Sequence, residues 1–200
     1  MLDRVTPGIT AMIRVDHSHV LALLRRYKPD VSAGRKRALA RNACLALEIH
    51  ARLEEEIFYP ALRPLMADDP VMLKSAPEHD EMRRLIGELK GRMSDDTADD
   101  PSFDGLFLEL MRVVMHHVAD EETRLLPAAE RLMADRLVPL GAEMTRRRME
   151  LMRPHAAEIA TTTARSFPAG AILLAAGALA VGAALIPRAR TAGNRLRLRH

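Results

Sequence analysis

The sequence predicts an all-α protein, an up-down-up-down four-helix bundle with a short closing helix and a C-terminal apolar helix. Apolar residues recur every three or four positions up to about residue 155, and no strand-like alternation is sustained. Breaks at residues 28–34, 64–70 and 94–101 divide this stretch into helical lengths. Because these connections are short, neighbouring helices should run antiparallel and pack into a bundle.

Each expected helix has a start signal or an apolar stripe of its own. Asp69-Pro70 and Asp100-Pro101 each place a capping residue before a proline at the first helical position. The apolar residues of each long helix form one stripe, which is typical of a helix packed in a bundle. The run Arg146-Arg147-Arg148 on the closing helix is interpreted as a solvated face. The expected helices cover residues 7–28, 34–63, 70–92, 102–134 and, for the closing helix, 139–152.

A stretch of a different kind follows the bundle. No residue from Ser166 to Pro187 is charged, and twenty residues at about 1.5 Å each would span the roughly 30 Å of a bilayer core. We therefore expect a transmembrane helix at 167–187, with a buried or crossing helix of a soluble oligomer as the alternative. The expected organisation is a bundle at 7–155, a linker at 156–166, the transmembrane helix at 167–187 and a basic tail at 188–200.

The N-terminal residues contain no long apolar run, so we expect a cytoplasmic bundle, anchored to the inner membrane by the C-terminal helix. Arginines lie on both sides of that helix and therefore give no orientation. A small-residue stripe in the same segment would allow self-association. The stripe consists of Ala176, Ala180 and Ala184.

Charge and cysteine content exclude several classes of protein. Residues 1–137 carry 20 basic and 24 acidic side chains, so the excess basic charge lies towards the C-terminus. A nucleic-acid-binding domain would carry its basic patch on the folded core, which argues against a nucleic-acid partner. Cys44 is the single cysteine and is expected in the core, so disulfide frameworks and cysteine-rich metal sites are excluded.

Four histidines fall in the middle of the four apolar stripes, one on each long helix. Successive members of the set are equidistant from the break between them. In an antiparallel bundle, residues equidistant from the connecting turn lie at the same depth, so all four should converge on one layer of the core. The four are His17, His50, His79 and His117.

Two carboxylates join this layer, because Glu54 and Glu121 each follow one of these histidines by four residues on the same helical face. Two ionised carboxylates in an apolar layer would cost several kcal/mol each without a cation. Imidazole suits iron, zinc, copper and nickel, and a carboxylate can bridge two cations. The set therefore predicts a metal centre with room for two ions, against the alternative of satisfied core histidines.

An internal repeat relates the second and fourth helices. Residues 50–68 align without gaps to residues 117–135, with nine of nineteen positions identical. Such a duplication would place one bridging carboxylate in each half of the bundle. Polar neighbours receive weaker interpretations: His19 and His116 as peripheral, and Asp16, Glu55, Glu78 and Glu122 as solvated or as contacts of the ligands.

Together these motifs resemble the hemerythrin HHE cation-binding family over about residues 10–155. The motifs are Asp16-His17, His50-x-x-x-Glu54-Glu55 with Pro60, Glu78-His79, and His117-Val-x-x-Glu121-Glu122 with Pro127. The resemblance implies an up-down-up-down bundle around a non-haem di-iron centre. It would place one iron on His17 and His50 and the other on His79 and His117. Glu54 and Glu121 would bridge the two ions.

One departure from the family pattern bears on function. Oxygen-carrying hemerythrins have a further histidine four residues after the third-helix ligand, where this chain has Arg83. The resemblance therefore implies an open coordination position, which favours sensing, peroxide reaction or iron release over simple oxygen transport. Ferritin-like di-iron carboxylate bundles use Glu-x-x-His, which is found at none of the candidate ligands.

We therefore expect a protein with two iron ions that binds O2, NO or peroxide for sensing, scavenging or iron handling, with an unknown output partner. A di-iron enzyme is the alternative, one that consumes peroxide or NO or donates iron for repair of damaged iron centres. In a third interpretation the bound metal only stabilises the fold.

Overall fold

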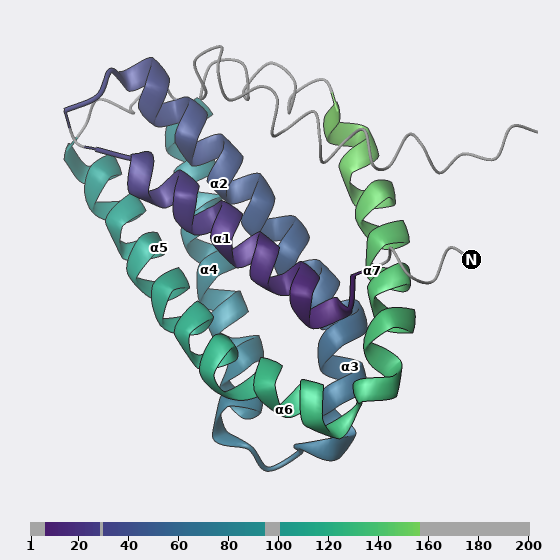
Figure 1. Cartoon of the computed structure of the whole chain (residues 1–200). Helices are drawn as coiled ribbons and strands as arrows, with labels where there is room; N and C mark the ends of the chain where they lie inside the picture. The colour runs from purple at the N-terminus through teal and green to yellow at the C-terminus, as the bar shows by residue number, and fades with distance from the viewer. Residues whose placement is uncertain (1–6, 29, 95–100, 157–200) are drawn as a thin grey trace, which may run out of the picture. The chain divides into compact units, whose positions relative to one another are not determined.

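A computed structural model describes residues 7–28, 30–94 and 101–156, and these residues are helical with no strand. Figure 1 shows four long helices side by side. Two of them continue through a π-helical turn into a shorter helix. The long helices are α1 (Ile9–Arg26), α2 (Ala33–Leu53), α4 (Pro70–Ser94) and α5 (Pro101–Asp120). The remaining helices are α3 (Tyr59–Leu62), α6 (Leu126–Leu132) and α7 (Leu137–Met152).

The four long helices form a closed ring of neighbours. α1 packs on α2, α2 on α4, α4 on α5, and α5 returns to α1. α1 runs antiparallel to α5 and its continuation α6, because Tyr27 meets Asp104 near the start of α5 and Arg14 meets Glu130 in α6. α7 packs against α1 and α2, as Figure 1 shows. The predicted helical bundle and its closing helix are therefore present.

The bounds of the predicted helices agree closely with those observed. Asp69 caps α4 as expected, with its Oδ1 accepting a hydrogen bond from the Val71 amide at 2.9 Å. Asp100 lies outside the described residues, as do the expected transmembrane helix at 167–187, the basic tail at 188–200 and nearly all of the linker. Among the described residues, no helix is both long enough and apolar enough to cross a membrane.

Two π-helical turns were not predicted, and each begins at one of the paired carboxylates. They cover Glu54–Phe58 and Glu121–Leu125. The carbonyl of Glu54 accepts from the amide five residues later, at Tyr59, and Glu121 does the same with Leu126. A proline comes next in both copies. A proline ring has no N–H and clashes with the carbonyl four residues back, which a wider turn avoids.

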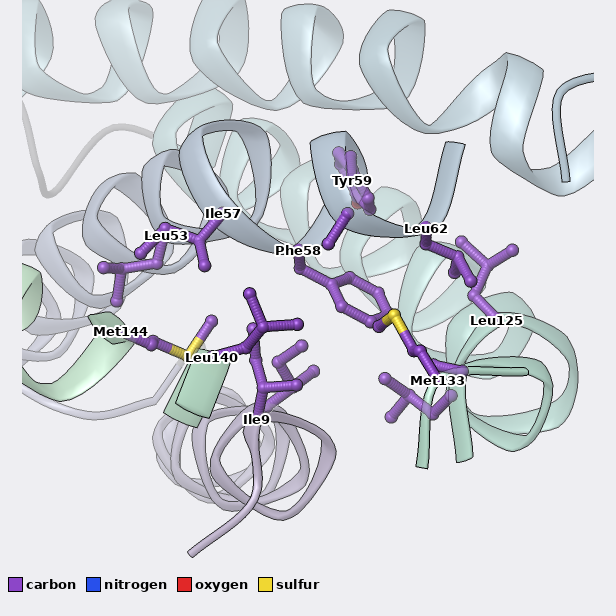
Figure 2. Packing of buried hydrophobic residues seen from close by; sticks show 14 of the residues in the cluster. Ile9, Leu53, Ile57, Phe58, Tyr59, Leu62, Leu125, Met133, Leu140 and Met144 are labelled. Carbon is purple, nitrogen blue, oxygen red and sulfur yellow. The ribbon is translucent and has the colours of Figure 1, made fainter. Parts of the chain in front are cut away.

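Beyond the histidine layer, an apolar cluster joins the first turns of α1 and α7 to α3 and α6 (Figure 2). It brings Ile9 together with Phe58, Leu140 and Met144, all at most 8% exposed. Gly141 makes the docking of α7 possible. A Cβ atom at this position would lie 2.1 Å from the carbonyl oxygen of Pro7, so only glycine permits this approach of two backbones.

At the opposite end of the bundle, an ion pair joins α2 to α5. Lys36, which is 5% exposed, lies 2.8 Å from Asp104 through its Nζ atom. The Tyr27 hydroxyl donates to the same carboxylate at 2.5 Å, and its ring stacks on Phe107 with centroids 3.9 Å apart. These contacts fix the register of the helices on either side of the site. Cys44 is buried in the core, as expected.

Candidate metal centre

The structure brings all six predicted ligand residues into one layer of the bundle. Their side chains come from four different helices and from both π-turns, and none is more than 4% exposed. The six are His17, His50, Glu54, His79, His117 and Glu121.

The six residues form two groups, each able to hold one metal ion. The first group contains four residues and the second three, and within each group the ligand atoms lie within 4.8 Å of one another. Glu54 belongs to both groups: its Oε2 lies 3.3 Å from Nε2 of His50 and 3.4 Å from Nε2 of His79. The groups are His17, His50, Glu54 and Glu121, and then Glu54, His79 and His117.

The chemistry of this donor set fits a cation. Nε2 of His50 and Oε1 of Glu54 are buried and have no hydrogen-bond partner, a state that is costly for a polar atom in the core. Burial raises the pKa of Glu54, but the neighbouring histidines outweigh that effect and hold it well below its usual range. A negative charge therefore lies in an apolar layer, where a metal ion bound between carboxylate and imidazole would satisfy both orphaned atoms.

A carboxylate lies near Nδ1 of each ring, and in three of the four rings it is within hydrogen-bond distance. Two of these contacts join the first half of the bundle (α1 to α3) to the second half (α4 to α6). In one of them, Nδ1 of His17 lies 2.8 Å from Oε1 of Glu122. The equivalent contact from the other half joins Nδ1 of His79 to Oε1 of Glu55 at 2.9 Å. Both Nε2 atoms therefore point to the centre, which is the arrangement that fixes the orientation of a metal-binding imidazole.

The other two histidines face a carboxylate from their own half. Nδ1 of His117 lies 2.9 Å from Oε2 of Glu78. Nδ1 of His50 and Oδ2 of Asp16 are 3.6 Å apart, which is beyond hydrogen-bond distance. All four carboxylates for which the sequence left two interpretations open thus touch candidate ligands.

Each of these four carboxylates is held in turn by a cation. The Arg148 guanidinium makes two contacts of 2.5 Å to Asp16, so this arginine is not simply part of a solvated face as predicted. Its position depends on how α7 docks, which local sequence pattern does not reveal. The other three pairs are Arg14 with Glu122 at 3.2 Å, Arg83 with Glu55 at 2.7 Å, and Lys74 with Glu78 at 3.4 Å.

Tyr59 also belongs to the centre, although the sequence did not single it out. Its hydroxyl donates to Oε1 of Glu121 at 2.8 Å and lies 3.3 Å both from Oε2 of Glu54 and from Nε2 of His79. Burial raises the pKa of Tyr59 well above its usual value, so the phenol is a neutral donor among these groups. The repeat held a signal: Tyr59 aligns with Leu126, a polar-for-apolar difference between otherwise similar copies.

The two remaining histidines near the site are peripheral, as expected. His116 is exposed, and its Nδ1 lies 3.4 Å from Glu78 and 3.3 Å from Asp120. His19 is exposed on the outer side of α1. Glu78 contacts both His116 and the candidate ligand His117, and so links the surface histidine to the centre.

The helical bundle and its buried layer of imidazoles and carboxylates assign this protein to the class of cation-binding helical bundles. Comparison with protein families identifies the family. The chain belongs to the hemerythrin HHE cation-binding domain family, whose family model matches residues 8–129. The match spans every candidate ligand and ends before α7.

A DNA nickase from Nostoc sp. (strain PCC 7120 / SAG 25.82 / UTEX 2576) is similar to this chain, with 27% identity over 126 residues. The match covers 63% of this chain but 34% of the nickase, so the chain spans about a third of that protein's length. No solved structure matches this chain.

Proposed function

We propose that this chain is a non-haem di-iron protein that binds O2 or NO at the buried centre, in sensing, scavenging or iron handling. The observation that carries the proposal is the sharing of Glu54 by two adjacent groups of donors, one with four residues and one with three. Imidazole and carboxylate are ligands that suit iron, and a shared carboxylate suits two neighbouring ions.

In this proposal iron supplies the affinity for a diatomic molecule, and the chain supplies position and surroundings. The four histidines present Nε2 to the centre because carboxylates face their Nδ1 atoms. The six donors are at most 4% exposed, so bulk water has little access to them. A dry site strengthens the attraction between charged donors and the cation.

Two enzymatic alternatives use the same centre: consumption of peroxide or NO, and donation of iron to damaged iron centres. Consumption of peroxide or NO differs from reversible binding in its stoichiometry, because an enzyme turns over many molecules per site. Donation of iron differs from both, because the centre itself loses metal. Cleavage of DNA, as the name of the nickase relative would suggest, is not part of the proposal, since residues 1–137 carry more acidic than basic side chains.

The first experiment is a metal and ligand titration of the full chain. We expect about two irons per chain, an absorption spectrum that changes on adding azide or NO, and stoichiometric uptake of NO. Continued consumption of NO or peroxide at catalytic amounts of protein would favour the enzymatic alternative. Zinc alone in protein from iron-replete cells would contradict the di-iron proposal.

We also propose that residues 167–187 tether the bundle to the membrane, because the segment is uncharged and about the length of a bilayer span. Membrane fractionation tests this part independently. The full chain should stay with the membrane pellet at high salt, and a chain in which Leu173, Leu179 and Leu185 are changed to Lys should be released.

A further inference from the structure

We propose that one end of the bundle docks on the surface of a lipid bilayer. This end is formed by the connection from α3 to α4 and the connection from α6 to α7, which lie at the same end of the bundle in Figure 1. An ion pair of 2.7 Å between Arg124, just before α6, and Asp69, just before α4, holds the two regions together. The proposal rests on the membrane tether proposed above and adds which end of the bundle faces the bilayer.

Large apolar side chains gather at this end. Among the described residues, eight such side chains are exposed, and four of them lie here, each 41–63% exposed. Single exposed apolar residues are ordinary on a protein surface, whereas a group of them in one place marks an interaction surface. We call this group the apolar end. It consists of Leu65, Leu73, Leu132 and Val138.

The internal repeat produces two of these exposed leucines. Residues 65–68 and 132–135 both have the sequence Leu-Met-Ala-Asp, so Leu65 and Leu132 are equivalent. In each copy the methionine leaves the helical conformation, with φ of −143° at Met66 and −140° at Met133, and packs on the apolar cluster of the core. The leucine before it stays on the surface in both copies and does not belong to that cluster.

Arginines accompany the apolar end. Arg63, Arg131 and Arg136 are exposed, and their side chains form no hydrogen bond or ion pair within the described part of the chain. At a bilayer boundary a guanidinium can bind lipid phosphate while its carbon chain lies on apolar surface. Asp68 and Asp135 are exposed here too, so three positive and two negative charges leave this end at +1. We therefore expect apolar contact to provide most of the affinity, and anionic lipid to add to it.

A bilayer fits this surface better than a helix of a protein partner does. A partner helix lays its apolar face into a continuous groove. The apolar end instead consists of side chains from separate turns at the ends of four helices. Leucines that enter the acyl boundary, with arginines at the headgroups, are typical of surfaces that lie on a membrane.

The proposed tether makes a weak contact of this kind sufficient. Ten residues, 157–166, separate the last described residue from the start of the tether, and ten residues span at most about 36 Å. A tethered bundle would therefore remain close to the bilayer, which gives its surface a high effective concentration of lipid. The four partly exposed side chains can then dock although their own affinity is low.

The opposite end of the bundle offers a different surface and hence a competing orientation. Around the connection from α1 to α2, the exposed side chains include Arg25, Lys28, Asp30 and Arg35. None of the exposed large apolar side chains lies within the described residues of this stretch, 25–35. A purely electrostatic contact with anionic lipid would favour this opposite end.

Fluorescent labels on the full chain compare the two orientations. Leu65→Cys, Leu132→Cys and Lys28→Cys each receive an environment-sensitive thiol label. Cys44 should stay unlabelled, because it is buried and burial raises its pKa to about 12. With vesicles of phosphatidylglycerol and phosphatidylcholine, we expect blue-shifted emission from labels at residues 65 and 132 and none from the label at residue 28.

Three results would overturn the proposal. A blue shift at residue 28 without one at 65 and 132 would show that the opposite end docks. A blue shift at residue 132 that needs no vesicles and grows with protein concentration would show contact between two copies of the chain. Sedimentation of the chain with vesicles, without a blue shift at any label, would reject the docking and leave the tether intact.

The affinity test removes the tether by substitution, in the full chain with Leu173→Lys, Leu179→Lys and Leu185→Lys. Adding Leu132→Ser should weaken binding to the same vesicles about fivefold, because roughly half of a leucine side chain leaves water on docking. Leu108→Ser is the matched control and should not change binding. Leu108 is 48% exposed and Leu132 51%, but the two lie roughly 36 Å apart along the helical run from α5 to α6.

The results separate docking from tethering. Equal binding by the Leu132→Ser and Leu108→Ser chains, or no binding of the tether-substituted chain at high lipid concentration, would contradict docking by the apolar end. If high salt releases the unsubstituted chain from membranes while the label at residue 132 still shifts on vesicles, the tether is contradicted and the docking stands.

Discussion

Nδ1 of His17 lies 2.8 Å from Oε1 of Glu122, although the two residues are 105 positions apart. The same contact recurs between His79 and Glu55 at 2.9 Å. Each half of the bundle therefore supplies the carboxylate that orients a histidine of the other half. Because of this exchange, neither half can form a complete centre alone.

The crossed contacts lead to a prediction about metal affinity. Glu122→Ala and Glu55→Ala remove no candidate ligand, but each frees an imidazole to rotate, and we expect a loss of about 10- to 100-fold in affinity. A competition titration with a coloured chelator measures it. Glu56→Ala is the control, because Glu56 lies in the same π-turn but pairs with Arg52 and Arg147. Equal losses in Glu55→Ala and Glu56→Ala would contradict the orienting role.

Removal of a central donor should have a larger effect. His79→Ala leaves the three-donor group with two residues, and Glu121→Ala reduces the other group to three. We expect both variants to hold at most about one metal per chain by elemental analysis. They should also lose the metal-dependent rise in melting temperature. His19→Ala, on the exposed face of α1, is the control and should retain full metal content. Unchanged metal in both variants would reject the ligand assignment.

Metal uptake should release protons. Burial lowers the pKa of His117, but Glu121, Glu54 and Glu78 outweigh this effect and raise it to about 10 in the metal-free protein. Glu121 and Glu54 likewise raise the pKa of His17 against the effect of burial. The His117 ring is therefore charged at pH 7, and the raised pKa of His17 favours its charged form, whereas a metal binds neutral imidazole.

We therefore expect about one to two protons released per chain on addition of Co²⁺, and an affinity that rises with pH from 7 towards 10. An indicator dye in weakly buffered solution measures the release. Mg²⁺ is the control, since it prefers oxygen ligands and should displace no proton from imidazole. Co²⁺ binding without proton release, at a constant affinity between pH 7 and 8, would contradict the protonated state of these rings.

Two glycines should respond in opposite ways to alanine. Gly141→Ala places a Cβ 2.1 Å from the Pro7 carbonyl oxygen, so a backbone must move, and we expect a loss of about 1–3 kcal/mol in the free energy of unfolding. Gly105 lies in α5 with nothing within 4 Å of an added Cβ. Gly105→Ala should raise the free energy of unfolding by about 0.5–1 kcal/mol, because alanine is the better helix former. Denaturant unfolding of both variants measures the contrast, and a neutral Gly141→Ala would show that α7 does not need this close approach.

The histidine layer could be predicted because the rise of an α-helix is uniform. Equal distances along two antiparallel helices lead to equal depths, so His17, His50, His79 and His117 converge without any knowledge of packing. The helix bounds followed from breaks such as Asp69-Pro70 for the same local reasons.

Tyr59 could not be placed from helical spacing. On a regular helix it would lie about 140° around the axis from Glu54, away from the centre. The π-turn closes from Tyr59 to Glu54 instead, five residues back, and turns the phenol inward. Proline at position 60 indicates such a turn only once the clash with the preceding carbonyl is considered. Arg148 was missed for another reason, because its contact with Asp16 joins residues 132 positions apart across a helix interface.

The contact between Arg148 and Asp16 also shows how far this domain extends. The family match ends at residue 129 and already includes every candidate ligand, yet Arg148 of α7 anchors the carboxylate that faces His50. Gly141 of α7 allows the backbone of this helix to approach the start of α1 closely. A chain that ended at residue 129 would keep all six candidate ligands but would lose the arginine that holds Asp16 beside His50. The contacts that support the donors therefore extend beyond the segment that the family model matches, as far as the helix that closes the bundle.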